Sequence, residues 1–134
     1  LVALDGSPRG LSVLQTTCDF AHAIGADLRA LTVEPARPDE PRYLAAQLPS
    51  ARSEALRDAV SRVAACARAG VTGDELLVRL GSPAPEILAA AADTGSDTIA
   101  IGFRRGGPSA VIEAGSTARQ VMHGAGCTVL TVPL

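Results

Sequence analysis

The chain has 134 residues, enough for one compact hydrophobic core and too few for two, so we expect a single domain. Apolar residues make up 47% of the sequence but aromatic residues only 2%, so the core must consist of Ala, Val, Leu and Ile, as in helices packed on a sheet. With a formal net charge of -2, the chain lacks the excess of basic residues that is typical of a nucleic-acid-binding protein. All twelve basic residues are arginine, which excludes the P-loop nucleotide hydrolases, because that class needs a lysine.

Cysteine usage and hydropathy predict a cytoplasmic protein with no membrane partner. Cys18, Cys66 and Cys127 are odd in number and widely spaced, which favours buried thiols in a reducing compartment over disulfides or a zinc site. No apolar run approaches the roughly 18 residues of a membrane span, and no signal peptide precedes the first strand. Leu1 already lies in an apolar run without an initiator Met, so we expect missing N-terminal residues and leave open a larger or tandem parent protein.

The first elements form a strand-helix-strand unit. Residues 1–5 predict a buried strand, and the helix that follows has Ser7 as its N-cap and Pro8 at its first position. This helix ends near Gly25, a typical C-terminal breaker. Residues 27–33 then predict a second strand, which leads into a proline-rich connection.

The rest of the chain continues the alternation of helix and strand. In chain order we expect a helix at 50–69, a strand at 76–80, a helix at 83–95, a strand at 97–102, a helix at 116–123 and a strand at 127–132. This alternation predicts a parallel, doubly wound sheet.

The segment from the fourth strand to the last helix carries the features of an anion site. Gly102 ends a strand. Gly115 follows thirteen positions later and begins a Gly-Ser-Thr turn, with Ser116 and Thr117, at the start of the last helix. N–H groups at a helix N-terminus point outward with the positive end of the helix dipole, and glycine lets an anion come close. We therefore expect phosphate binding here.

The spacing of these glycines resembles the Gly-x2-Gly-x9-Gly-(Ser/Thr) nucleotide loop of the universal stress protein family. Further strings resemble the family in the same order along nearly the whole chain: Val-Ala-Leu-Asp-Gly-Ser, Gly-Ser-Pro-Ala, Asp-Thr-Ile-Ala-Ile-Gly, Gly-Ser-Thr-Ala-Arg-Gln-Val and Cys-Thr-Val-Leu-Thr-Val-Pro. One position departs from the pattern, because Arg105 stands where the second glycine is expected.

The resemblance implies an α/β fold with a five-stranded parallel sheet of order 3-2-1-4-5 and helices on both faces. Such a fold is Rossmann-like and similar to the adenine nucleotide alpha hydrolases. In this order the direction of winding reverses between strands 1 and 4, and open parallel sheets bind ligands in the crevice at such a point.

The resemblance also implies roles for individual residues. Those matching the family's positions around the adenine and ribose are Ala3, Leu4, Asp5 and Val33, with Asp5 as an acceptor for ribose hydroxyls. Those matching the phosphate positions are Gly102, Gly115, Ser116 and Thr117. Against this, Ala3, Leu4 and Val33 would be core residues in any such fold, and Asp5 would stabilise the turn before the first helix. Both interpretations stay open.

Two arginines leave the phosphate contact undecided. Three alternatives stay open. In the first, the side chain of Arg105 fills the phosphate position. In the second, Arg104 and Arg105 donate charge-assisted hydrogen bonds to a phosphate, and in the third both side chains are solvated. Glu113 places a negative charge two residues before the proposed anion site.

We expect no catalytic residues, and at most slow ATP hydrolysis. His22 and His123 lie near helix C-termini, hence at the edge of the sheet away from the crevice. The cysteines fit buried, inert thiols. Near the crevice, Asp5 and Glu34 are the candidates to hold Mg²⁺.

The first functional hypothesis is a stress-related regulatory protein that binds ATP or another adenine nucleotide at the crevice and thereby changes what protein partners recognise. The second is a family member that has lost nucleotide binding and acts as an interaction module. A third is a different small ligand in the same crevice. Residues 127–132 form an apolar edge strand in the implied order, so we expect a homodimer through it.

Overall fold

The computed structural model describes residues 1–35, 50–66, 71–104 and 115–134. Its elements, in chain order, are β1 (Val2–Leu4), α1 (Pro8–Ile24), β2 (Leu28–Glu34), α3 (Ala51–Cys66), β3 (Val71–Leu80), α4 (Pro83–Asp93), β4 (Thr98–Phe103), α5 (Ser116–Gly124) and β5 (Thr128–Pro133). Strands and helices therefore alternate as the sequence predicts.

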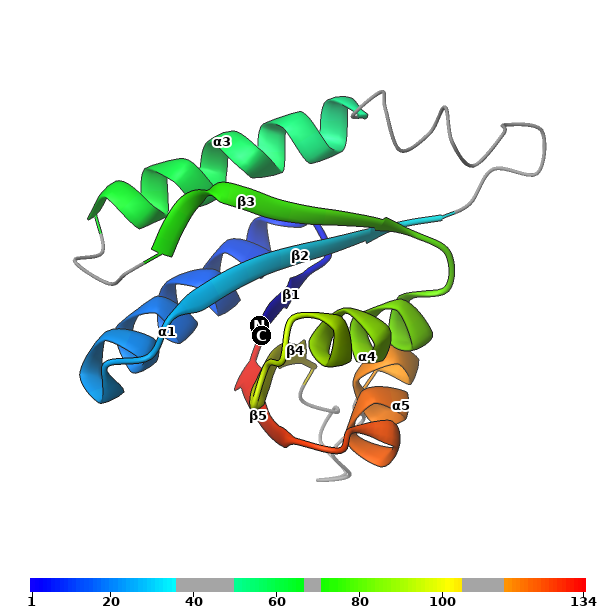
Figure 1. Ribbon diagram of the computed structural model, residues 1–134. Helices are drawn as coiled ribbons and strands as arrows, with labels where there is room; N and C mark the ends of the chain where they lie inside the picture. Colours follow the sequence, from blue (N-terminus) through cyan, green and yellow to red (C-terminus); the bar gives the residue numbers. More distant parts are fainter. Residues whose placement is uncertain (36–49, 67–70, 105–114) are drawn as a thin grey trace.

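The described strands form one parallel sheet of order β3-β2-β1-β4-β5, which confirms the predicted fold class (Figure 1). The short strand β1 is central: Ala3 pairs with Leu31 of β2 on one side and with Ile101 of β4 on the other. Helices α1 and α3 cover one face of the sheet, and α4 and α5 cover the other (Figure 1). The winding reverses between β1 and β4, as expected.

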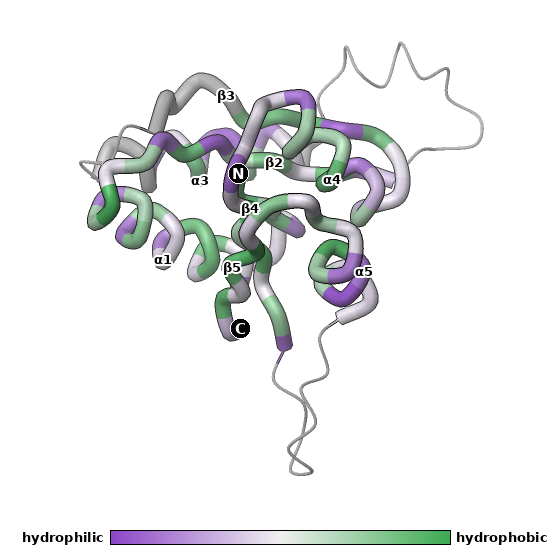
Figure 2. The backbone as a smooth tube through the Cα atoms, turned by 60° about the horizontal axis from the view of Figure 1, so that its bottom comes forward, coloured by the Kyte–Doolittle hydropathy of each residue, from purple (hydrophilic) through white to green (hydrophobic). Residues whose placement is uncertain are grey.

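Each face of the sheet has its own apolar core. On the α1 side the cluster contains Val2, Leu4, Val13, Leu14, Cys18, Leu56 and Val60, among others. On the α4 and α5 side it contains Leu31, Val33, Ile87, Ile99, Ile101 and Val121, among others. In Figure 2 hydrophobic segments run along β4 and β5, while α1 and α5 alternate between hydrophobic and hydrophilic residues. Burying each Leu, Ile or Val side chain contributes about 1.5–3 kcal/mol, so the two clusters together hold the helices on the sheet.

Local signals set the ends of α1. The Ser7 hydroxyl accepts a hydrogen bond from the Gly10 N–H at 3.1 Å, and Pro8 stands in the first turn, as predicted. At the other end Gly25 adopts a left-handed conformation with φ of 67°, and its N–H bonds back to the last turn.

Strand β3 is longer than predicted, because it begins at Val71 rather than at Leu76. Gly73 and Asp74 are residues typical of turns, which is why the sequence favours a loop there. The pairing with β2 shifts between Leu28 and Ala30, so the strand continues through this segment with an irregularity in its register. In the part of the chain with assigned structure, no helix has the length and apolar character required to cross a membrane.

Candidate functional site

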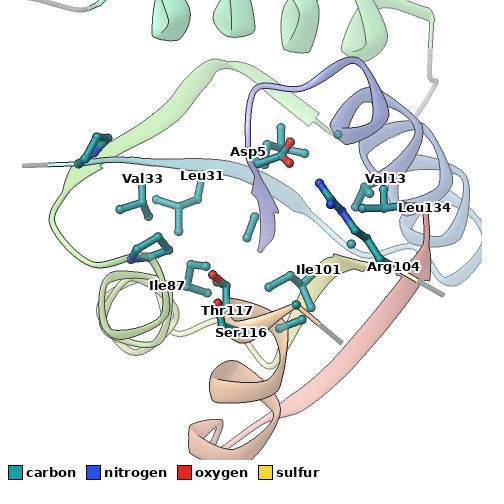
Figure 3. A pocket seen from close by; sticks show the side chains of 18 of the residues that line it. Asp5, Val13, Leu31, Val33, Ile87, Ile101, Arg104, Ser116, Thr117 and Leu134 are labelled. Carbon is teal, nitrogen blue, oxygen red and sulfur yellow. The ribbon is translucent and has the colours of Figure 1, made fainter. Parts of the chain in front are cut away.

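A cavity of about 460 Å³ opens at the carboxyl edge of the sheet, where the winding reverses. It is lined by residues from the ends of β1, β2 and β4 and from the N-terminal parts of α1, α4 and α5. Figure 3 shows labelled side chains from these elements around one space, with Asp5, Arg104 and Thr117 among them. The cavity therefore lies where the strand order predicts a ligand.

One group of lining residues is apolar. It is formed by Leu31 and Val33 of β2 together with Pro83 and Ile87 of α4. Leu31, Val33 and Ile87 are buried, and in Figure 3 they lie side by side, away from Arg104.

Polar lining residues come from two places: Ser116 and Thr117 of α5 lie beside Ile87 in Figure 3, and Arg104 lies on the other side of the space. The first i to i−4 hydrogen bond of α5 runs from the Arg119 N–H to the Gly115 carbonyl. The N–H groups of Ser116 and Thr117 come before it, so they have no acceptor within the helix. Arg104 extends from the end of β4 towards the side of the cavity formed by Asp5 (Figure 3).

Of the helices that begin at this edge, α1, α4 and α5 contribute residues to the cavity lining, and their N-termini differ in charge compensation. The N-terminus of α1 is capped by Ser7, which accepts from Gly10. That of α4 carries Glu86 in its first turn, and a Cβ at Gly81 would lie 3.0 Å from Glu86 Oε1. The first turn of α5 contains no acidic residue, and its N-cap, Gly115, has no side chain to accept from it. The favourable end for an anion is therefore that of α5.

Asp5 is held in the turn between β1 and α1. Its Oδ1 accepts from the Ser7 N–H at 2.9 Å and from the Ser7 hydroxyl at 2.7 Å. Gly10 lies directly beneath, since a Cβ at that position would be 2.8 Å from the same oxygen. Asp5 therefore both stabilises the turn and lines the cavity, so the two interpretations of this residue are compatible.

Gly102 has a packing role that its sequence motif does not reveal. A Cβ there would lie 2.9 Å from Val13 Cγ2 and 3.2 Å from Leu134 Cδ1, so apolar side chains fill the space that a side chain would take. At Gly115 a Cβ would meet no described atom within 4 Å. Close approach of a ligand thus explains Gly115 better than it explains Gly102.

Glu34, one of the two candidates to hold Mg²⁺, is not among the residues that line the cavity. Glu34 accepts a hydrogen bond from the Ser50 hydroxyl, and Ser50 also accepts from the Ser53 N–H at 3.1 Å. The Glu34 carboxylate is therefore engaged with the segment that begins α3. Among the described residues no group of three or more His, Cys, Asp or Glu is arranged to hold a metal ion.

All predicted site residues except Arg105 line this one cavity: Ala3, Leu4, Asp5, Val33, Gly102, Arg104, Gly115, Ser116 and Thr117. Arg105 and Glu113 lie outside the described residues. The sequence analysis missed the lining residues Gly10, Val13, Leu31, Pro35, Gly81, Pro83, Ile87, Ile101, Ala118 and Leu134. The Gly81-Ser-Pro sequence could have indicated Gly81 and Pro83 as lining residues, because it begins a helix at the same edge of the sheet as the other lining segments.

His22, His123 and Cys18 lie away from the cavity. His22 and His123 are exposed in the last turns of α1 and α5, as helix direction predicts. Cys18 is buried in the α1 core, and this burial raises the pKa of its thiol. Cys127 is half-buried just before β5. None of these residues is positioned to act on a ligand in the cavity.

A doubly wound parallel sheet with a mixed apolar and polar cavity at its switch point defines a class of small-ligand-binding α/β proteins. Within that class, the sequence profile of the Universal stress protein family matches residues 1–133, so the chain belongs to this family. A search of curated proteins found no relative.

Solved structures of universal stress proteins share the fold. One from Archaeoglobus fulgidus has 26% sequence identity and a TM-score of 0.71, with 97% of this chain and 94% of that chain covered. A universal stress protein in complex with cAMP has 24% identity and a TM-score of 0.68, covering 98% and 94%. One from Archaeoglobus fulgidus in complex with dAMP has 21% identity and a TM-score of 0.55, covering 97% and 93%.

Proposed function

We propose that this protein binds an adenine nucleotide in the cavity at the β1/β4 switch point and acts as a nucleotide-responsive binding protein rather than as an enzyme. The observation that carries this proposal is the convergence of residues from β1, β2, β4 and α5, far apart in sequence, on one cavity with both apolar and polar lining residues. Two solved members of the family were determined with cAMP and dAMP, which supports an adenine nucleotide as the class of ligand.

The proposed orientation follows from the chemistry of the lining residues. The base lies between Val33 and Ile87, where the lining is apolar. Asp5, held by Ser7, accepts from the ribose hydroxyls. The phosphate lies at the N-terminus of α5, where the N–H groups of Ser116 and Thr117 are donors.

Gly115→Val tests this proposal, because it obstructs the proposed phosphate position without disturbing packing. Gly115 has φ of -51°, which valine tolerates, and a Cβ there meets no described atom within 4 Å. We expect adenine nucleotides to raise the melting temperature of the wild-type protein, since ligand at about 100 times its Kd adds roughly 2.7 kcal/mol. Gly115→Val should abolish this shift while melting like the wild type without ligand.

The matched control is Gly126→Val. Gly126 is equally open to a Cβ, but it lies between α5 and β5, at the other edge of the sheet. This variant should retain the full nucleotide shift. A wild-type protein with no shift in any adenine nucleotide contradicts the proposal and leaves the interaction module as the better account of the chain. An equal loss of the shift in both variants contradicts the assigned position of the phosphate.

A further inference from the structure

Thr32 differs from the other buried polar residues in the described part of the chain. Thr17, Thr32 and Ser53 are each 4% exposed or less. The hydroxyls of Thr17 and Ser53 donate to backbone carbonyls four and three residues earlier in the sequence. The Thr32 hydroxyl donates instead to the Leu4 carbonyl at 3.1 Å, 28 positions away. Of these three side chains, that of Thr32 therefore joins two separate elements, β2 and β1.

The position of Thr32 in β2 shows what its hydroxyl adds. Side chains alternate along a strand, so Thr32 shares a face with Leu28 and Ala30, which pack in the core on the α1 side of the sheet. A hydroxyl buried there costs free energy unless it has a hydrogen-bond partner, whereas a valine would need none. The hydrogen bond to Leu4 is therefore the specific contribution of a threonine at this position.

Leu4 lies where the pairing of β1 ends. It pairs with Thr32 on the β2 side, whereas the described pairing of β1 with β4 ends at Ala3 and Ile101. Gly6, two residues further on, has φ of 71°, and glycine restricts the backbone less than any other residue. The Thr32 hydroxyl thus holds the end of β1 at the point where the chain leaves the sheet.

A fixed Leu4 carbonyl also fixes the start of Asp5. The peptide unit is planar, so the carbonyl oxygen of Leu4 and the N and Cα atoms of Asp5 move as one rigid group. The carboxylate of Asp5 is held separately, because its Oδ1 accepts from the N–H and the hydroxyl of Ser7. Asp5 lines the cavity (Figure 3), so β2 holds the backbone of a cavity residue and the N-cap of α1 holds its side chain.

From these observations we infer that Thr32 is a positioning residue of the nucleoside site, although it does not line the cavity. Its hydroxyl holds the peptide unit between Leu4 and Asp5 so that the Asp5 carboxylate faces the ribose hydroxyls. This inference rests on the proposed nucleotide site. It specifies a residue outside the cavity that determines the preference of the site for a ribose with both hydroxyls.

Isothermal titration calorimetry on the intact chain tests the inference with adenosine and with 2′,3′-dideoxyadenosine, which lacks both ribose hydroxyls. The wild type should bind adenosine about tenfold more tightly, because a carboxylate accepts from these hydroxyls. Thr32→Val should reduce this preference to about threefold or less, and its affinity for dideoxyadenosine should stay within about twofold of the wild type. An unchanged preference, or an equal loss of affinity for both nucleosides, overturns the inference.

Thr32→Ser and Thr17→Val are the matched controls. Thr32→Ser keeps the hydroxyl and should restore the preference to about tenfold. Thr17→Val removes a similarly buried hydroxyl that bonds within α1, so it should keep the preference of the wild type. A Thr32→Ser protein without the preference, or an equal decrease in Thr17→Val, contradicts the role of the Thr32 hydroxyl. If Thr32→Val does not unfold cooperatively in urea, Thr32→Ala provides the same comparison without a methyl group beside the Leu4 carbonyl.

A double variant shows whether Thr32 acts through Asp5. Asp5→Ala removes the acceptor and should lower the affinity for adenosine by about tenfold. Adding Thr32→Val to Asp5→Ala should lower this affinity no further, because the residue that Thr32 positions is already absent. A further loss of about threefold or more in the double variant would show an effect independent of Asp5 and would contradict the inference.

The outcomes separate this inference from the proposed function. If the wild type binds neither nucleoside nor any adenine nucleotide, the proposed function is overturned and the inference with it. If the wild type binds both nucleosides equally, the nucleotide site stands, but the contact of Asp5 with the ribose and the inference are overturned. If the wild type prefers adenosine and Thr32→Val keeps this preference, only the inference is overturned.

Discussion

Gly102 illustrates how one residue type serves different purposes at the same site. Its place in the glycine spacing predicts close approach of a phosphate, yet Val13 and Leu134 occupy the space that a side chain would need. Gly115, thirteen positions later, faces open space instead. The two glycines should therefore respond differently to substitution, although they belong to the same motif.

We expect Gly102→Ala to lower the free energy of unfolding by about 1–3 kcal/mol, because its methyl group forces Val13 and Leu134 to move. Urea denaturation without ligand measures this loss. Gly126→Ala, where a Cβ meets no described atom within 4 Å, should show no loss. A Gly102→Ala protein that keeps wild-type stability but loses nucleotide would restore the interpretation of Gly102 as a phosphate contact.

The reactivity of Cys18 gives a second prediction at this scale. Cys18 is fully buried among core residues of α1, and burial raises the pKa of its thiol, so both access and the thiolate population are reduced. Iodoacetamide should therefore modify Cys18 only after unfolding, as measured by peptide mass spectrometry with and without urea. Rapid modification in the native protein would contradict the assigned core position.

At the scale of elements, the turn before α1 links helix stability to the site. The Ser7 hydroxyl accepts from the Gly10 N–H and donates to Asp5 Oδ1, so one side chain caps the helix and orients a cavity residue. Ser82 occupies the equivalent N-cap position of α4, but its side chain makes no capping hydrogen bond. The two serines therefore form a natural comparison.

Ser7→Ala should cost about 1 kcal/mol of stability, as loss of an N-cap does, and should also weaken adenosine binding because Asp5 is no longer held. Ser82→Ala should change both quantities little. Urea denaturation and calorimetry provide the two measurements. Equal destabilisation by both substitutions would show that the hydrogen bonds of Ser7 are not what stabilises α1.

At the scale of the whole molecule, β5 forms one end of the sheet, and among the described strands it pairs with β4 alone. Its residues Val129, Leu130 and Thr131 are half-buried, so apolar atoms remain accessible along this strand. Unpaired strand edges of this kind favour association with a second chain. The homodimer through residues 127–132 remains our prediction for the assembly.

Size-exclusion chromatography with light scattering should show a dimer at tens of micromolar, an order-of-magnitude concentration for weak dimers. Thr131→Lys places a charge on the edge strand and should give a monomer. Thr16→Lys makes the same change at an exposed position of α1 and should leave the dimer intact. A wild-type monomer at this concentration, or equal effects of the two lysines, would contradict this interface.

The sequence by itself determined the order of elements, the capping of α1 by Ser7 and the family's glycine spacing, because these depend on local periodicity and on residues near one another in the chain. The predicted start of β3 was wrong. Gly73 and Asp74 favour a turn locally, whereas pairing with β2 extends the strand. The family resemblance predicted part of the cavity lining, and only the tertiary structure added residues such as Leu31, Ile87 and Leu134.

The composition of the cavity lining depends on contacts between segments far apart in the sequence. Leu134 and Val13 meet at Gly102 because β4 lies between β1 and β5, and this sheet order is not encoded in any local pattern. Glu34 contacts Ser50 rather than the cavity because the segment leading into α3 lies beside the end of β2. Local residue preferences thus determined the elements, and the packing of the sheet determined the chemistry of the site.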